Sequence, residues 1–531
     1  TVTVRVDGRR LFGRYEADAR SGEAVGRRLP DDKKKKKKDA EANGEEDAAD
    51  EDGAPYVPAV AIGPWATWPP LPEEAPPAVV VRGATLWTAG PRGTFKGDLL
   101  VRDGVIAAIG TGVQVPAGAL VIDGHGRHVT PGIIDCHSHA FVDGGVNEGT
   151  NSCTAEVRIA DVVDAETVDL YRQLAGGVTT SNLLHGSANA IGGQNAVVQL
   201  RWGHSPGALM LEGAKPGIKF ALGENPKRSN WGHQFAPRYP RSRSGVEGLI
   251  RERFLAARNY RRARDTYLQA EDDSKVPPRI DLQLEALAEI LEGERLVHCH
   301  SYRQDEILAM IRLAEEFGFT VGTFQHVLEG YKVAKELAAH GAGASTFSDW
   351  WAYKFEVYDA IAYNAAIMVR AGVLTSINSD SSEMARRLNQ EAGKSVRYGG
   401  LPENDALAMV TLNPAKQLAI GDRLGSLEVG KLADFVVWSA PPLSMQALAD
   451  ETWITGRRYW DRLGRDREAR TLLEVERREL LRAAAAARWS DEDGPKPGTW
   501  KPTFGRRMAE TEAERGHALH QGCCVVEEEG R

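Results

Sequence analysis

Cysteine is scarce in this chain, and long apolar runs are absent from it. Five cysteines in 531 residues are too few for a scaffold held together by disulfides. No apolar stretch approaches the roughly 18 residues that a membrane-spanning helix needs, so we expect no membrane span. The 42% hydrophobic content is nevertheless sufficient for a large core. The composition therefore predicts a globular protein with a substantial apolar interior.

Positive charge is not in excess either. The chain has 66 Lys and Arg residues against 74 Asp and Glu residues, a net charge of -8, which favours neither DNA nor an anionic membrane surface as a partner. An arginine-rich helix is expected within an insertion at Gly223–Pro278, but the acidic residues interspersed there argue against a nucleic-acid face. We expect a small-molecule substrate, and the sequence leaves open whether the chain forms a homo-oligomer.

The first 75 or so residues differ in composition from the rest. Lys33–Lys38 is a basic run, and the acidic, Ala-rich stretch that follows it to Asp52 cannot bury a core, so a disordered linker is expected there. Before it, Val2–Val6 and Leu11–Tyr15 are expected to add a strand or hairpin to a β domain. Because the chain begins at Thr1, the compartment stays open between the cytoplasm and export after removal of a signal peptide.

Two histidines separated by one residue follow a short apolar run. Thr130–Cys136 is typical of a strand, and His137 and His139 lie at its end. Side chains two positions apart on a strand face the same side, close enough to share one divalent ion. Because His-x-His pairs also arise by chance, this motif needs support from elsewhere in the chain.

Three further candidate ligands, His298, His326 and Asp380, each close a short apolar run. Helical patterns lie between these runs, such as Leu284–Leu291 and Ile307–Ala314, where apolar residues recur at spacings of three and four. The alternation of strand and helix predicts an α/β fold with a parallel sheet wrapped by helices. In a closed (β/α)8 barrel the C-terminal strand ends converge on one site, so we expect these ligands to meet in space.

The length of the chain fits one (β/α)8 TIM-like barrel with a small discontinuous β-sandwich domain and terminal extensions. Short strands separated by Gly turns precede the barrel, and a strand-like segment returns after it. The predicted division is an N-terminal arm and linker at 1–75, a composite β domain at 76–130 plus 420–460, the barrel at 131–419, and a C-terminal helix and tail at 461–531.

Taken together, these motifs resemble the amidohydrolase superfamily, and more narrowly the branch related to imidazolonepropionase and to metal-dependent dipeptidases. The resemblance spans Ala78 to Trp460. Its signatures are Pro131–His139, Gly176–Thr180, His298 with His300, Asn378–Asp380 and Gly425–Asp434. The resemblance implies a site for one or two metal ions, zinc first. Its implied ligands are His137, His139, Lys219, His298, His326 and Asp380.

Lys219 lies in the strand-like run Gly217–Leu222, where the resemblance implies the fourth-strand ligand. An ammonium cannot bind a cation, so the amine would have to lose its proton and take up carbon dioxide, forming a carbamate that bridges two ions. Burial lowers the pKa of a lysine, as this reaction requires. The alternative is an ammonium that pairs with a carboxylate beside a single metal. The state of Lys219 therefore decides between one ion and two.

The expected chemistry is attack by metal-activated water on a C–N bond. Asp380 would take the water's proton and deliver it to the departing nitrogen. His185 or His300 could stabilise the oxyanion. The alternatives are wall packing for His185 and orientation of a ligand for His300. Arg228, on the loop after Lys219, could bind a substrate carboxylate or remain a solvated charge.

Three functions compete at this stage. The preferred one is a metal-dependent hydrolase of an amide, cyclic amide or small peptide, including a dipeptidase. A deaminase acting on a heterocycle usually has a Glu shortly after the fifth-strand His, but here Ser301 is third after His298 and no carboxylate occurs before Asp305. A non-catalytic barrel that only binds is disfavoured because all six ligands are present.

The aromatic segment Asp349–Phe355 could form a wall of the pocket or pack against the insertion.

Overall fold

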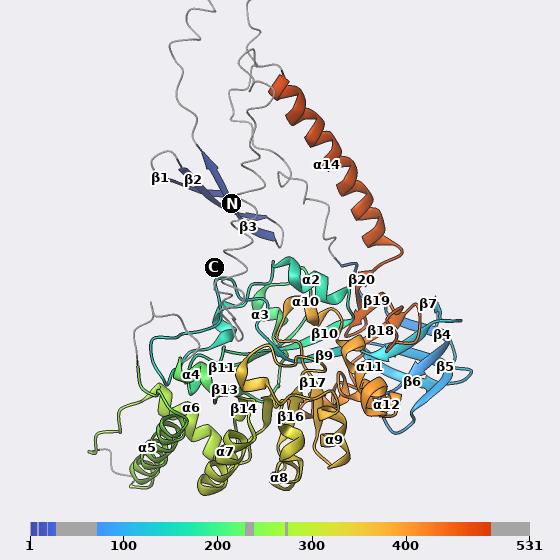
Figure 1. The fold of residues 1–531 in the computed structure, drawn as a ribbon. Coiled ribbons are helices and arrows are strands. Elements are labelled where there is room, and N and C mark those ends of the chain that lie inside the picture. The colour runs from blue at the N-terminus through green and yellow to red at the C-terminus, as the bar shows by residue number, and fades with distance from the viewer. Residues whose placement is uncertain are drawn as a thin grey trace, which may run out of the picture.

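The computed structural model describes residues 2–7, 10–17, 20–27, 72–228, 238–270 and 274–489. It is a mixed α/β protein in which parallel strands are followed by helices (Figure 1). The predicted linker up to Asp52 and the tail beyond residue 489 lie outside the described residues. Within the described part of the chain, no helix is both long and apolar enough to cross a membrane.

Five parallel strands lie side by side in sequence order. They are β13 (Gly217–Ala221), β14 (Leu296–Ser301), β15 (Thr323–His326), β16 (Gly343–Thr346) and β17 (Thr375–Ile377). Almost every residue in them is buried, which is typical of parallel strands covered on both faces. β11 (Ile191–Gln194) adds an antiparallel edge beside β13.

The first two strands of the expected barrel form a separate ladder. β9 (Ile133–Ser138) runs parallel to β10 (Val178–Leu183), and β12 (Ala196–Gln199) pairs with β10 in antiparallel orientation. The backbone just after β17 contacts β9, because the Asp380 amide donates a hydrogen bond to the His137 carbonyl at 3.2 Å. The described ladders are thus two sheets, and a closed (β/α)8 barrel stays a prediction.

The helices that follow the parallel strands cover them along one side of the molecule (Figure 1). In α7 (Gln304–Phe317) the buried residues Ile307, Met310, Ile311 and Ala314 share one face at the expected spacing, and Gly318 ends the helix in the left-handed region. The longer helices are α5 (Arg243–Gln269), α6 (Leu282–Leu291), α7 (Gln304–Phe317) and α11 (Leu388–Gly399). The insertion helix predicted within 223–278 is therefore present as α5.

Short helical turns make up most of the remaining connections. The α-helical turns are α2 (Val168–Leu174), α3 (Pro206–Leu209), α4 (Glu224–Lys227), α8 (Ala334–His340), α9 (Asn364–Arg370), α10 (Ser382–Ala385), α12 (Glu403–Ala408) and α13 (Leu412–Gln417). The 3-10 turns are η1 (Ile159–Val162), η2 (Gly330–Lys332) and η3 (Phe355–Val357). Several of them follow a parallel strand directly and so lie next to the strand ends.

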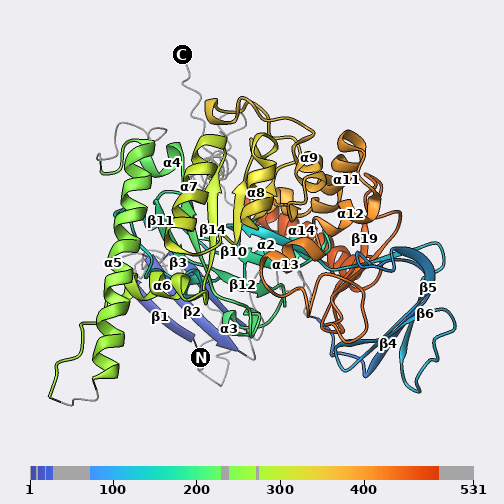
Figure 2. The ribbon, with the colours of Figure 1, turned by 90° about the horizontal axis from the view of Figure 1, so that it is seen from below.

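An eight-stranded sheet lies at the opposite end of the body from α5 (Figure 2). Strands from two distant parts of the chain build it, because β18 (Phe435–Trp438) pairs with β8 (His128–Pro131), which also pairs with β4 (Ala78–Trp87). Its members are β4 (Ala78–Trp87), β5 (Thr94–Arg102), β6 (Val105–Gly110), β7 (Leu120–Asp123), β8 (His128–Pro131), β18 (Phe435–Trp438), β19 (Ala449–Ile454) and β20 (Arg457–Asp461). The sheet is discontinuous in sequence, while its description as a sandwich stays a prediction.

Strand β18 connects this sheet to the rest of the protein through its alternating side chains. Phe435 and Val437 belong to the core of the eight-stranded sheet, whereas Val436 and Trp438 belong to the core that contains β10 and α2. The Trp438 indole donates to Thr130 Oγ1 at 2.9 Å. One strand therefore contributes to two cores, and Trp438 lies where they meet.

The N-terminal strands differ from the expectation in their pairing. β1 (Val2–Asp7), β2 (Arg10–Ala17) and β3 (Arg20–Arg27) contain the two predicted segments. They pair with one another in a separate antiparallel sheet and not with the eight-stranded sheet, because each residue of β1 and β3 finds its partner on β2. At the other end, the predicted charged helix is present as α14 (Arg465–Trp489), which projects away from the body (Figure 1).

The contact between Gly177 and Trp438 should contribute measurably to stability. Gly177 has φ +83°, and a Cβ there would lie 2.9 Å from the indole ring of Trp438. Gly341 has a similar φ of +81° but open space around it. We expect both Gly→Ala variants to suffer the left-handed backbone cost of roughly 1–2 kcal/mol. Gly177→Ala should lose about 1–3 kcal/mol more through overpacking.

Urea denaturation of the two variants measures this difference directly. Equal losses in the free energy of unfolding would show that the close approach of Trp438 does not penalise a Cβ at position 177.

Candidate metal site

The C-terminal ends of β9 and β17 bring three predicted ligands together. His137 Nε2 lies 3.2 Å from His139 Nε2, and Asp380 Oδ1 lies 3.4 Å from His137 Nε2 and 3.2 Å from His139 Nε2. Among the described residues, these three side chains form a group able to hold a metal ion, with ligand atoms within 4.8 Å of one another. Two imidazole nitrogens and a carboxylate oxygen form a donor set that suits zinc and related divalent ions.

The tautomers of both histidines are fixed by partners on their other ring nitrogens. His139 Nδ1 donates to the Leu184 carbonyl at 2.8 Å, and His137 Nδ1 donates to Gln325 Oε1 at 3.2 Å. With the proton on Nδ1, each Nε2 carries a lone pair directed toward Asp380. This is the arrangement by which proteins orient histidine ligands toward a metal.

Lys219 reaches the same place from β13. Its side chain is fully buried, and its Nζ lies 3.1 Å from His137 Nε2. Strand register also sets Lys219 beside His298 of β14. The structure therefore places Lys219 with the other predicted ligands, and its conversion to a carbamate stays a prediction.

His298 and His326 supply further buried imidazoles. Neither ring nitrogen of either residue has a hydrogen-bond partner among the described residues, although both side chains are almost completely buried. Burial, with Lys219 as a second cause, lowers the pKa of His298 to about 3, so this ring is neutral and can donate a lone pair. His326 Nε2 lies 3.9 Å from Asp380 Oδ2. Buried nitrogens without partners are costly, and a metal ion would satisfy them.

Of the two predicted oxyanion histidines, only His300 lies in the ring cluster around His326. The His300 ring lies 4.8 Å from that of His326 and 4.7 Å from that of Tyr302. His185 instead donates from Nδ1 to the Gly186 carbonyl at 2.8 Å and accepts at Nε2 from the Glu148 amide at 2.9 Å. Both ring nitrogens of His185 are thus engaged, and its catalytic role stays a prediction.

Arg228 ends the short helix α4 after β13. It lies in the left-handed region with φ +55°, and its amide donates to the Asn225 carbonyl at 2.9 Å. The side chain is half-buried, and burial lowers the pKa of Arg228. Its position on a loop after a parallel strand agrees with the expectation, while its role in binding a substrate carboxylate stays a prediction.

Several residues near the site were not predicted from the sequence. Gln325 orients His137, and Asn225 lies with its Nδ2 3.5 Å from His300 Nε2. Phe347 stacks on the His326 ring at 4.8 Å, and Trp350 stacks on Phe347 at 4.0 Å. The sequence signal for Gln325 was a polar amide inside a short apolar strand. The aromatic segment at 349–355 thus contributes at least one ring to the layer behind His326.

Removing the amide of Gln325 should weaken metal binding without removing a ligand. Gln325→Leu leaves His137 Nδ1 without its acceptor, so we expect zinc affinity to fall by roughly 10- to 100-fold. Gln173→Leu is a matched control, because Gln173 is fully buried in α2 and its amide atoms have no hydrogen-bond partner in the described part of the chain. Competition with a chelator measures both affinities, and equal values for the two variants would contradict the assigned role of Gln325.

Comparisons with known proteins agree with this geometry. Residues 128–457 match the model of the amidohydrolase family. The chain is 31% identical to amidohydrolase tasK from Hapsidospora irregularis over 428 residues, which is 72% of this chain but 43% of that relative. It is 25% identical to imidazolonepropionase from Mesorhizobium japonicum over 65% of this chain and 86% of that protein.

A solved structure is also similar over most of its length. The crystal structure of an amidohydrolase from Thermotoga maritima matches with a TM-score of 0.66 and 32% identity, covering 72% of this chain and 100% of that one. The chain spans less than half the length of the tasK relative, so that protein's further regions have no counterpart in the match. The family match nonetheless covers most of this sequence, including every predicted ligand, and the chain belongs to the amidohydrolase family.

Proposed function

We propose that this protein is a metal-dependent hydrolase that cleaves a C–N bond in an amide, a cyclic amide or a small peptide. The observation that carries the proposal is the convergence of His137 Nε2, His139 Nε2 and Asp380 Oδ1, beside the neutral His298. Family membership supports the same chemistry. Zinc is the ion we propose first, with one ion if Lys219 remains an amine and two if it carries a carbamate.

The proposed roles of the protein's own groups follow from their positions. A bound divalent ion would lower the pKa of a water ligand to about 7 and polarise a substrate carbonyl. Asp380 has one oxygen facing both His137 and His139 and the other facing His326, so it can hold the proton released by the attacking water. The same carboxyl can then deliver that proton to the departing nitrogen.

The substrate is proposed to enter from the side of His300 and α4. His300 is buried beside Asn225 and can hydrogen-bond a developing oxyanion. Arg228, four residues beyond the start of α4, can bind a carboxylate bidentately. Together these groups suit an N-acyl amino acid or a dipeptide.

The positions of two carboxylates disfavour a deaminase. Asp305 and Glu306 are the first acidic residues after His298. Asp305 pairs with Arg303 at 3.0 Å, and Glu306 pairs with Arg243 at 2.7 Å. Both carboxylates lie in α7, the helix that follows β14, and both pair with arginines. Neither therefore has the position of the proton-transferring Glu that a deaminase of this type uses.

The proton transfer assigned to Asp380 is open to a direct test. Asp380→Asn removes the base, so we expect the rate of hydrolysis to fall by about 10²–10⁴-fold. The control is Asp123→Asn, which changes an exposed carboxylate in the eight-stranded sheet. Both variants are assayed on a panel of dipeptides and N-acyl amino acids after zinc reconstitution. Full activity in Asp380→Asn would exclude the proposed proton transfer, and no hydrolysis by the wild-type protein on the panel would contradict the substrate class.

A further inference from the structure

A buried carboxylate lies next to α4, the short helix that contains Asn225 and is capped by Arg228. Glu356, in η3 after β16, is 3% exposed, and its Oε1 accepts a hydrogen bond from the Glu224 amide at 2.8 Å. The two residues are 132 positions apart in sequence. The contact therefore ties the loop after β13 to the loop after β16.

Gly223 makes this contact possible. It has φ +84°, and a Cβ at this position would lie 2.8 Å from Glu356 Oε1. A side chain there would push the carboxylate away from the Glu224 amide, besides being strained in its backbone. The contact therefore depends on both residues, because only a glycine at position 223 leaves room for the Glu356 carboxylate.

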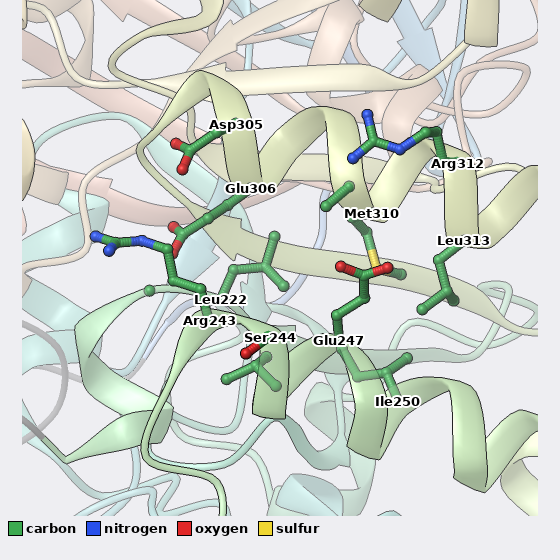
Figure 3. Close-up of a pocket in the computed structure, with 13 residues that line it drawn as sticks. Leu222, Arg243, Ser244, Glu247, Ile250, Asp305, Glu306, Met310, Arg312 and Leu313 are labelled. Atoms are coloured by element: carbon green, nitrogen blue, oxygen red, sulfur yellow. The ribbon is translucent and has the colours of Figure 1, made fainter.

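Charged groups from three other elements surround the carboxylate. Lys354 Nζ lies 2.9 Å from Glu224 Oε1, and Arg243 Nη2 lies 3.8 Å from Glu356 Oε1. Arg243 from α5 also reaches Glu306 of α7, and the two side chains point toward each other at the edge of a pocket between these helices (Figure 3). Burial, together with Glu224 and Glu306, raises the pKa of Glu356 to about 7. Burying a carboxylate costs free energy unless it is hydrogen-bonded or paired, and here the Glu224 amide and Arg243 supply these partners.

The segment next to Glu356, α4, is too short to be stable without tertiary contacts. Helix α4 has four residues, and an isolated helix of that length is not stable. Its Asn225 Nδ2 donates to Ser187 Oγ at 2.7 Å and lies beside His300, and its C-cap is Arg228. The orientation of these groups toward the site therefore depends on how the start of α4 is fixed.

We propose that Glu356 is a positioning residue, which acts through Gly223 and Glu224 to hold α4 and thereby sets Asn225 and Arg228 for substrate binding. The part of this inference that concerns substrate rests on the proposed function. The fixing of α4 does not, because it follows from the contacts alone.

Hydrogen exchange and steady-state kinetics of Glu356→Ala test the two parts separately. Loss of one hydrogen bond should speed exchange of the 223–228 amides and raise KM, each by roughly 2- to 10-fold, with little change in kcat. Glu451→Ala is the control, because Glu451 is a buried glutamate of β19 that bonds the Trp453 indole in the eight-stranded sheet. This control should change neither quantity.

The conservative variant separates positioning from general damage. The amide oxygen of Glu356→Gln can still accept from Glu224, so this variant should keep both the exchange rates and KM near the wild-type values. Unchanged exchange in Glu356→Ala overturns the fixing of α4, whatever the activity. Faster exchange with unchanged KM overturns the role in substrate binding. An inactive wild-type protein counts against the proposed function, and the exchange rates still decide whether Glu356 holds α4.

Discussion

The site depends on one buried carboxylate that needs positive charge around it. The side chain of Asp380 is almost completely buried, and its oxygens face His137, His139 and His326. A carboxylate in such a place is costly unless it is paired or coordinates a metal. The surrounding imidazoles are poor substitutes for a cation, because an imidazole carries no charge unless it is protonated. A bound divalent ion would resolve this conflict, and it would also offer a partner to the ring nitrogens of His298 and His326, which lack hydrogen bonds in the described part of the chain.

The rest of the fold serves to bring these groups to one point. The Asp380 amide bonds to the His137 carbonyl, and Ser379 donates to Asp135, so the residues after β17 are fixed against β9. Lys219 and His298 are held in register by neighbouring strands. Around this centre, longer-range contacts fix the loops, as Glu356 fixes the start of α4. The proposed metal ligands thus come from strand ends, while the groups proposed for substrate binding come from loops that other residues hold.

Sequence patterns predicted the convergence of the candidate ligands better than the groups that orient them. His137, His139 and Asp380 were predictable because each ends an apolar run, and the ends of parallel strands meet. Gln325, Asn225 and Glu356 were not, because no strand-end pattern links them to their partners, which are 188, 75 and 132 positions away and which only tertiary packing brings close. For the same reason the engagement of both nitrogens of His185 could not be foreseen, nor could the separate sheet of β1–β3.

The central claim is that these buried groups exist to hold a metal ion, and the metal content of the purified, zinc-reconstituted protein tests it most directly. Elemental analysis should find close to one equivalent of bound zinc if Lys219 is an amine, and close to two if it carries a carbamate. Replacement of both His137 and His139 by alanine should abolish that binding. A wild-type protein that holds no metal after reconstitution, or a double variant that holds as much as the wild type, would contradict the account.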